Sequence, residues 1–247
     1  MSKPTTMKNK IIVITGASTG LGKQIAFKAS SLGAKVILIS NEEKRLKRVN
    51  SHIKRSKGKS EFYFCNIRNL NQVKDVIKNI VKKNKKIDIL INNAGVWTDD
   101  ELEKKNTDLR KNAIYTNTLG NIQFIEEILP ILLKQSSGHI FNVISTSGVS
   151  GIADGDNSNW KTYGASKWAM TGYTKALRDK LKGTHIKVTG FYPGGFDSML
   201  YERAGRKNAH KQPWMMKVDD VADTVIFALT RPKDVLIQSM VVTKFSN

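Results

Sequence analysis

One feature restricts the fold of this chain more than any other. It is a run of apolar, β-branched residues that leads directly into a glycine-rich turn. Residues 11–14 form the apolar run, and Gly16, Gly20 and Gly22 follow it. Such a run is typical of a parallel strand that is buried on both faces. We expect a helix from the turn to about Leu32, with an N-terminus whose free amides and dipole attract phosphate. The glycine spacing differs from G-x-G-x-x-G, so the turn alone is also consistent with a purely structural role.

The rest of the chain alternates strand-like and helix-like segments without a break. Further strands are expected over residues 36–40, 61–65, 87–91, 139–144, 185–192 and 235–242. Further helices are expected over residues 42–55, 71–83, 107–135, 161–181 and 218–229. We expect the helix over 107–135 to be interrupted or ended near Pro130. The alternation predicts an α/β fold, a doubly wound Rossmann-type parallel sheet of about seven strands with helices on both faces, in a single domain over residues 1–247.

The charge of the chain is strongly positive. It has 41 lysine and arginine residues against 21 aspartate and glutamate residues, a formal net charge of +20. Many of the cations cluster in residues 44–59 and 82–86. Such a surface could hold nucleic acid through phosphate contacts. Because no basic groove interleaved with aromatic residues accompanies the clusters, we favour a solvated, lysine-rich exterior and expect no nucleic-acid partner.

Three further features concern the compartment. No apolar run approaches the roughly 18 residues needed to span a bilayer, so no membrane partner is expected. The first ten residues are polar and lack the apolar core of a signal peptide, which favours a cytoplasmic protein. Cys65 is the single cysteine and ends an apolar run, so we expect a buried thiol that forms no internal disulfide.

Tyr163 and Lys167 are a candidate acid–base pair. They lie four residues apart in an expected helix and therefore share one face. A nearby cation favours the phenolate, so we expect Lys167 to lower the pKa of Tyr163 from its usual value of about 10. A phenol tuned in this way can pass a proton to or from an alcohol oxygen. Alone the spacing is a weak signal, because a lysine-rich chain with 6 tyrosines produces such a pair by chance.

Five short motifs occur in the order in which the short-chain dehydrogenase/reductase family carries them. They are Thr15-Gly16-x3-Gly20-x-Gly22, Asn92-Asn93-Ala94-Gly95, Ser145, Tyr163-x3-Lys167 and Pro193-Gly194. From about residue 9 to residue 243 the chain resembles the compact branch of that family. Residues 231–237 resemble its NADP-dependent 3-hydroxy-acid and serine dehydrogenase subgroup. The resemblance implies an oxidoreductase that transfers a hydride between a nicotinamide cofactor and an alcohol or carbonyl substrate.

The resemblance also implies roles for four catalytic residues. Tyr163 would be the general acid or base, and Lys167 would lower its pKa and bind the ribose hydroxyls. Ser145 would hydrogen-bond the carbonyl oxygen, a role that fits Ser147 less well. Asn117 would hold a water for proton relay to the lysine. Ser145 and Tyr163 are 18 residues apart, more than is usual in the family, and the extra residues over 154–160 would either shape the substrate pocket or form a surface insertion.

The residues that the resemblance places against the cofactor come from the turns that follow five of the strands and from the helix expected over 161–181. They are Thr15, Gly16, Ser18, Thr19, Gly20, Leu21, Gly22, Ser40, Asn41, Asn66, Ile67, Asn93, Ala94, Gly95, Tyr163, Lys167, Pro193, Gly194, Phe196 and Ser198. No metal site is expected. A substrate loop is expected at about 195–216.

The end of the second strand favours NADP(H) over NAD(H). An NAD-selective enzyme usually has an acidic residue there, to bind the ribose hydroxyls. This chain has Ser40 and Asn41, which can donate hydrogen bonds to a 2′-phosphate, and the cations over 44–45 are close. Two features oppose this preference. Thr19 stands where many NADP-preferring relatives have a basic residue, and two carboxylates follow at 42–43.

Other interpretations remain open. The chain could be a cofactor-binding sensor without catalysis, although the complete set of four catalytic residues argues against such a loss. It could be a basic nucleic-acid-binding protein. An epimerase-type relative is disfavoured by the short C-terminal part and the glycine spacing. Relatives pair their long helices near 107–135 and 161–181 across a two-fold axis, so we expect a homodimer or homotetramer.

Overall fold

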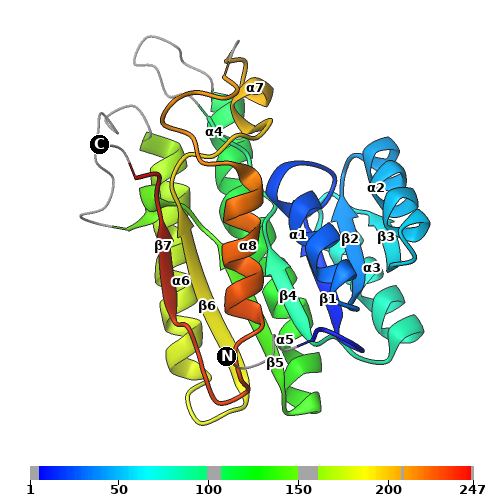
Figure 1. Cartoon of the computed structure of the whole chain (residues 1–247). Coiled ribbons are helices and arrows are strands. Elements are labelled where there is room, and N and C mark those ends of the chain that lie inside the picture. Colours follow the sequence, from blue (N-terminus) through cyan, green and yellow to red (C-terminus); the bar gives the residue numbers. More distant parts are fainter. Residues whose placement is uncertain (1–5, 99–106, 150–160, 207–208, 246–247) are drawn as a thin grey trace.

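A computed structural model of the chain describes residues 6–98, 107–149, 161–206 and 209–245 (Figure 1). Within these residues seven strands form one parallel sheet in the order β3-β2-β1-β4-β5-β6-β7. The strands are β1 (Ile11–Thr15), β2 (Lys35–Ser40), β3 (Lys59–Phe64), β4 (Ile89–Asn92), β5 (Gly138–Val143), β6 (Ile186–Pro193) and β7 (Ser239–Val242). The doubly wound α/β fold expected from the sequence is confirmed.

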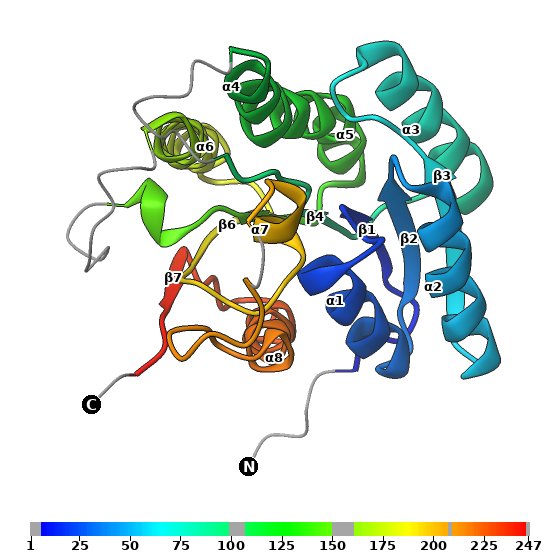
Figure 2. The ribbon, with the colours of Figure 1, turned by 90° about the horizontal axis from the view of Figure 1, so that it is seen from above.

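Helices cover both faces of the sheet, as the view from above shows (Figure 2). One core cluster packs β1 and β2 against α1 (Gly20–Ser31), α2 (Glu43–Arg55) and α8 (Val218–Leu229). The other face is packed by α3 (Leu70–Asn84), α5 (Asn121–Gln135) and α6 (Lys161–Lys180). α4 (Thr107–Ile114) contacts α6, and the four-residue α7 (Leu200–Arg203) lies beyond the carboxyl ends of the strands (Figures 1 and 2).

The strand order reverses between β1 and β4, because the chain runs outward from β1 to β2 and β3 and then crosses back to β4. A sheet of this kind has a crevice at such a switch point, beyond the carboxyl ends of its strands. The turns that carry the predicted motifs follow β1, β2, β4, β5 and β6, so they all open at this edge.

The helix expected over 107–135 is interrupted at a different place. The α-helix continues through Pro130 to Gln135, while residues Tyr115–Gly120 form a π-helix between α4 and α5. Pro130 is exposed, so the carbonyl that its missing N–H leaves unpaired can be hydrated. In the π-helical turn, Asn121 Nδ2 donates to Thr116 O at 3.1 Å and to Asn117 O at 3.0 Å, so this side chain adds hydrogen bonds to the wider turn.

The last strand is shorter than expected, since only residues 239–242 belong to β7. The preceding segment is tied to β6 by side chains instead. Lys187 Nζ donates to Val235 O at 2.6 Å, and Thr189 Oγ1 donates to Ile237 O at 2.7 Å. Among the described residues no helix is long and apolar enough to cross a membrane. The segment 154–160 lies outside the described residues.

Candidate active site

The glycine turn after β1 is locked to the turn after β4. Thr15 Oγ1 accepts hydrogen bonds at 3.0 Å from the backbone amides of both Asn93 and Ala94, and Asn93 Nδ2 donates to Thr15 O at 2.9 Å. Gly16 has a φ of +64°, and a Cβ there would lie 2.9 Å from the Cα of Ala94. A side chain is therefore excluded at Gly16 both by its left-handed backbone and by the close approach of the two turns.

The N-terminus of α1 opens into the same space. Its N-cap, Thr19, makes no side-chain cap hydrogen bond, and the first turn contains no acidic residue. The first amides of the helix are therefore open to an incoming anion. Gly22 lets the helix approach this closely, since a Cβ there would lie 2.5 Å from Asn93 Nδ2. A Cβ on Gly20 would lie 3.5 Å from Cβ of Ser198, so Ser198 stands over the start of the helix.

Ser145, Tyr163 and Lys167 come together across two elements. Ser145 follows β5 and begins a 3-10 turn, Thr146–Gly148, with its Oγ accepting from Ser147 N at 3.1 Å. α6 packs directly on this turn, because a Cβ on Gly148 would lie 2.8 Å from Lys167 O. Tyr163 hydrogen-bonds Ser145, and Lys167 Nζ lies 5.5 Å from the centroid of the Tyr163 ring. All three side chains are more than nine-tenths buried.

Burial moves the pKa values of this pair in directions set by the loss of solvent. Burial, with the nearby Tyr201, raises the pKa of Tyr163 above its ordinary value, and the hydrogen bond from Ser145 offsets this only in part. Burial also lowers the pKa of Lys167 to about 8. The expectation that Lys167 lowers the pKa of Tyr163 is therefore wrong for the chain on its own. The Lys167 ammonium lies beside the Tyr163 ring, but the free-energy cost of burying a phenolate exceeds the attraction between the phenolate and the ammonium.

Asn117 lies in the π-helix and is fully buried. Its Oδ1 accepts from Val96 N at 2.8 Å, while its Nδ2 donates to Val96 O at 2.9 Å and to Ser166 Oγ at 3.0 Å. A Cβ on Gly95 would lie 3.3 Å from Asn117 Oδ1 and 3.6 Å from Lys167 Nζ. Asn117 therefore clamps the turn after β4 beside Lys167, and both polar ends of its side chain are used by the chain itself.

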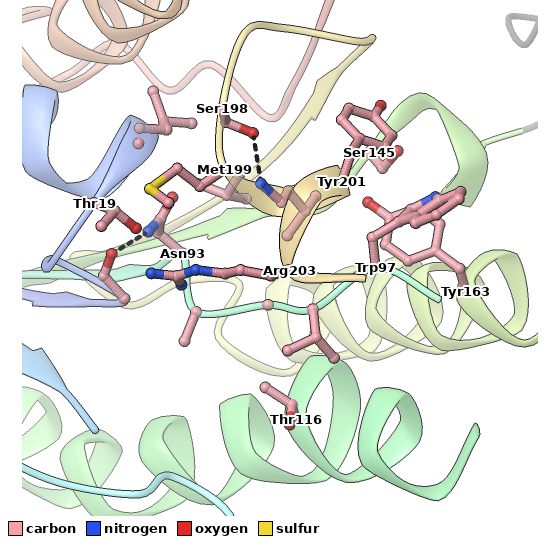
Figure 3. Close-up of a pocket in the computed structure, with 18 of the residues that line it drawn as sticks. Thr19, Asn93, Trp97, Thr116, Ser145, Tyr163, Ser198, Met199, Tyr201 and Arg203 are labelled. Carbon is pink, nitrogen blue, oxygen red and sulfur yellow. Dashed lines mark hydrogen bonds between the residues drawn. The ribbon is translucent and has the colours of Figure 1, made fainter. Parts of the chain in front are cut away.

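These parts line one continuous pocket, which runs from the end of β2 to the α6 pair. The pocket is lined by all the predicted site residues except Thr15, Gly22 and Asn117, each of which holds a neighbouring wall in place. Figure 3 shows Ser145 and Tyr163 with Trp97 on one side of it and Thr19 with Asn93 on the other.

An aromatic cluster forms the wall nearest Tyr163 and was not predicted. Tyr201 of α7 packs edge-on against Trp97, with ring centroids 5.2 Å apart, and against Trp214 at 5.6 Å. Tyr163 belongs to the same buried cluster. Trp97 could have been found from its place just after the motif at β4, but no sequence signal marks Tyr201, whose position depends on how the segment after β6 folds back.

At the far end, the turn after β3 contributes Cys65, Asn66 and Ile67 to the lining. Asn66 N donates to Gln72 Oε1 at 2.8 Å, and Asn66 Oδ1 accepts from Arg68 N at 3.2 Å. The buried thiol expected at Cys65 is confirmed, and burial raises its pKa to about 11, so the thiol stays protonated at neutral pH.

The end of β2 holds a network of hydroxyls around one carboxylate. Ser40 Oγ donates to Ser18 Oγ at 3.0 Å, and Ser18 Oγ donates to Glu42 Oε2 at 2.7 Å. The same carboxylate oxygen accepts from Arg203 Nη2 at 2.6 Å. Burial raises the pKa of Glu42, but the Ser18 hydrogen bond and Arg203 outweigh it, so the pKa lies below its ordinary value. A carboxylate thus lies beside the hydroxyls predicted to face the ribose.

The fold and the pocket define a doubly wound α/β protein with a glycine turn and a helix N-terminus at one end of its crevice and a buried Ser–Tyr–Lys group at the other. Among the described residues no cluster of three or more histidine, cysteine, aspartate or glutamate side chains could hold a metal ion.

Comparison with known proteins agrees with this class. A family model described as short chain dehydrogenase matches residues 10–209. An uncharacterized oxidoreductase of Staphylococcus epidermidis is 30% identical over 236 residues, which is 96% of this chain and 97% of the relative. The chain therefore belongs to the short-chain dehydrogenase/reductase family of oxidoreductases.

Two solved structures are each 25% identical in sequence. The closed form of a serine dehydrogenase complexed with NADP+ superposes with a TM-score of 0.84, covering 95% of this chain and 94% of that one. A metagenomic short-chain oxidoreductase in complex with NADP superposes with a TM-score of 0.80, covering 98% and 99%.

Proposed function

We propose that this protein is an NAD(P)(H)-dependent oxidoreductase that transfers a hydride between the cofactor and an alcohol or carbonyl substrate. The observation that carries the proposal is the position of Tyr163. It is hydrogen-bonded to Ser145, lies beside Lys167, and stands at one end of a pocket whose other end is the glycine turn. A proton donor and an anion-binding turn in one crevice are what a reduction by a bound dinucleotide requires.

The residues present fit such a cofactor. The open amides of α1 and the close approach at Gly16 suit a pyrophosphate, and Ser18 and Ser40 supply hydroxyls where a ribose would follow. Pro193, Gly194, Phe196 and Ser198 line the same pocket. When bound, the nicotinamide supplies or accepts the hydride.

The chain's own residues would handle the proton. Because the pKa of Tyr163 is raised, its phenol is protonated at neutral pH, the form that donates to a carbonyl oxygen in reduction. Ser145, already hydrogen-bonded to the phenol, would donate to the same oxygen as negative charge develops on it. Lys167 would stabilise the phenolate left behind and bind the ribose hydroxyls. Asn117 fixes the turn beside Lys167, and its role in holding a relay water stays a prediction.

We propose NADP(H) as the preferred cofactor. Neutral donors at Ser18 and Ser40 and the guanidinium of Arg203 meet at the end of β2, where a 2′-phosphate would lie. The serine dehydrogenase and the metagenomic oxidoreductase described above are complexes with NADP+ and NADP, which supports this choice by analogy. Glu42 is the group that opposes it.

The remaining parts of the proposal are the substrate loop, the assembly and the compartment. Residues 195–216 would cover a small-molecule substrate, since α7 contributes Tyr201 to the pocket wall. A homodimer or homotetramer would form through the long helices, whose surface carries the exposed Tyr115, Leu119 and Trp168. The cytoplasm is the proposed location.

A panel of aldehydes, ketones and 2-oxo acids offered with NADPH or NADH tests this function through the loss of reduced-cofactor absorbance. We expect consumption with at least one carbonyl, and faster consumption with NADPH. Binding of NADPH without consumption of any carbonyl would favour a cofactor-binding sensor. Retention of nucleic acid on filters in moderate salt, with no nicotinamide nucleotide bound, would favour the nucleic-acid alternative.

A further inference from the structure

Glu42 holds two segments of the pocket rim together. Its carboxylate accepts from Arg203 of α7 at 2.6 Å and from Ser18 of the glycine turn at 2.7 Å, and Arg45 Nη1 lies 3.8 Å from its other oxygen. A second contact joins the same segments, because Arg45 Nη1 donates to Met199 Sδ at 3.3 Å. These contacts hold the segment after β6 against the start of α2. They lie over the end of the pocket that contains Ser18 and Ser40.

These contacts narrow the space that a cofactor would occupy. Met199 and Arg203 line the pocket and extend between its two sides in Figure 3. The cavity volume is about 270 Å³, below the roughly 300–1,000 Å³ of sites that enclose drug-sized ligands. A dinucleotide is larger than such ligands, so one that reaches the end of β2 would meet Arg203 together with the hydroxyls of Ser18 and Ser40.

The groups around Glu42 are those that recognise a phosphate. Guanidinium forks suit phosphate oxygens, and hydroxyls add further donors. Here the anion they bind is a carboxylate of the chain itself, which is ionised at neutral pH because its pKa is lowered. A dianionic 2′-phosphate placed on Ser18 and Ser40 would repel this carboxylate and offer Arg203 three acceptor oxygens. A ribose 2′-hydroxyl would instead donate to the carboxylate and leave the pair with Arg203 intact.

We propose that Arg203 is a specificity-determining residue, which exchanges the Glu42 carboxylate for the 2′-phosphate of NADP(H) and so holds α7 (Leu200–Arg203) over that cofactor. Glu42 is the internal competitor that holds Arg203 when the phosphate is absent. The inference rests on the proposed function and adds to it that one side chain, that of Arg203, determines both the cofactor choice and the position of α7.

Two adenine nucleotides test this without the nicotinamide chemistry. 2′,5′-ADP carries the 2′-phosphate and 5′-AMP lacks it, and isothermal titration calorimetry measures the Kd of each for the full chain. Arg203→Gln should weaken 2′,5′-ADP about tenfold or more, as expected for the loss of a charge-assisted hydrogen bond, and leave 5′-AMP unchanged. Glu42→Gln should strengthen 2′,5′-ADP, because the competing charge is gone.

Arg48→Gln is the matched control, since it removes the same charge from an exposed position of α2 and should change neither Kd. The inference would be overturned if the ratio of the Kd for 2′,5′-ADP to the Kd for 5′-AMP were the same in Arg203→Gln as in Arg48→Gln. It would also be overturned if Glu42→Gln bound 2′,5′-ADP more weakly than the wild type does. A wild type that binds 5′-AMP as tightly as 2′,5′-ADP would overturn it while leaving a nicotinamide cofactor possible. A wild type that binds neither nucleotide would overturn the proposed function as well.

Discussion

Replacing Lys167 by methionine should stabilise the cofactor-free protein while removing a group that turnover needs. The ammonium is buried, and burial lowers its pKa from 10.5 to about 8. At 1.36 kcal/mol for each pH unit, this shift corresponds to about 3 kcal/mol of unfavourable free energy in the folded state. Because the folded pKa is the lower one, the cost is fully present below about pH 8 and disappears as the pH rises towards 10.5.

Urea unfolding of wild type and Lys167→Met at about pH 7 and about pH 9.5 measures this cost. The variant should be the more stable at the lower pH, and its advantage should shrink by about 2 kcal/mol at the higher pH, where the wild-type lysine is largely neutral when folded. Lys175→Met, exposed on the same helix, should keep a constant difference from wild type. A difference for Lys167→Met that is independent of pH, or that widens at high pH, would refute the reasoning.

Three other predictions concern the buried Asn117, the ion pairs of His210 and the oligomeric state. Asn117→Ala should lower the free energy of unfolding by about 1–3 kcal/mol, because both backbone groups of Val96 lose a buried partner; urea unfolding without such a loss would contradict it. His210 lies between two carboxylates that raise its pKa, so its charge is lost as the pH rises through that raised value, and the amides of residues 197–203 should then have lower protection factors, measured against their intrinsic exchange rates, than at low pH; in His210→Gln these protection factors should not change over the same pH range. Trp168→Asp should shift sedimentation towards the 27.6 kDa monomer, and a wild type that is already monomeric at micromolar concentration would exclude the proposed pairing.

The parts of the pocket that could be placed from the sequence depend on short stretches of it. A buried strand followed by a glycine-rich turn is typical of the start of a doubly wound fold. In the structure, Gly16 of this turn lies so close to Ala94 that no side chain would fit. The spacing of Tyr163 and Lys167 is likewise a local property of one helix. Because the carboxyl ends of parallel strands share an edge, motifs that are far apart in sequence could be placed in one crevice before the structure was known.

The parts that could not be predicted depend on contacts between distant segments. Arg203 and Glu42 are 161 residues apart, and their contact requires the fold of the segment after β6. The pKa of Tyr163 depends on how deeply the ring is buried, which its distance of four residues from Lys167 does not reveal. The π-helical turn at 115–120 depends on Asn121, whose amide partners become apparent only when the turn after β4 is in place.

The measurement that tests the central claim most directly compares the wild type with Tyr163→Phe in carbonyl reduction by NADPH, together with NADPH binding to each. Phenylalanine keeps the buried ring and removes only the hydroxyl that Ser145 contacts. The account predicts that kcat falls by roughly 10²–10⁴-fold, as loss of a general acid implies, while the Kd for NADPH stays close to the wild-type value. An unchanged kcat in Tyr163→Phe would contradict it.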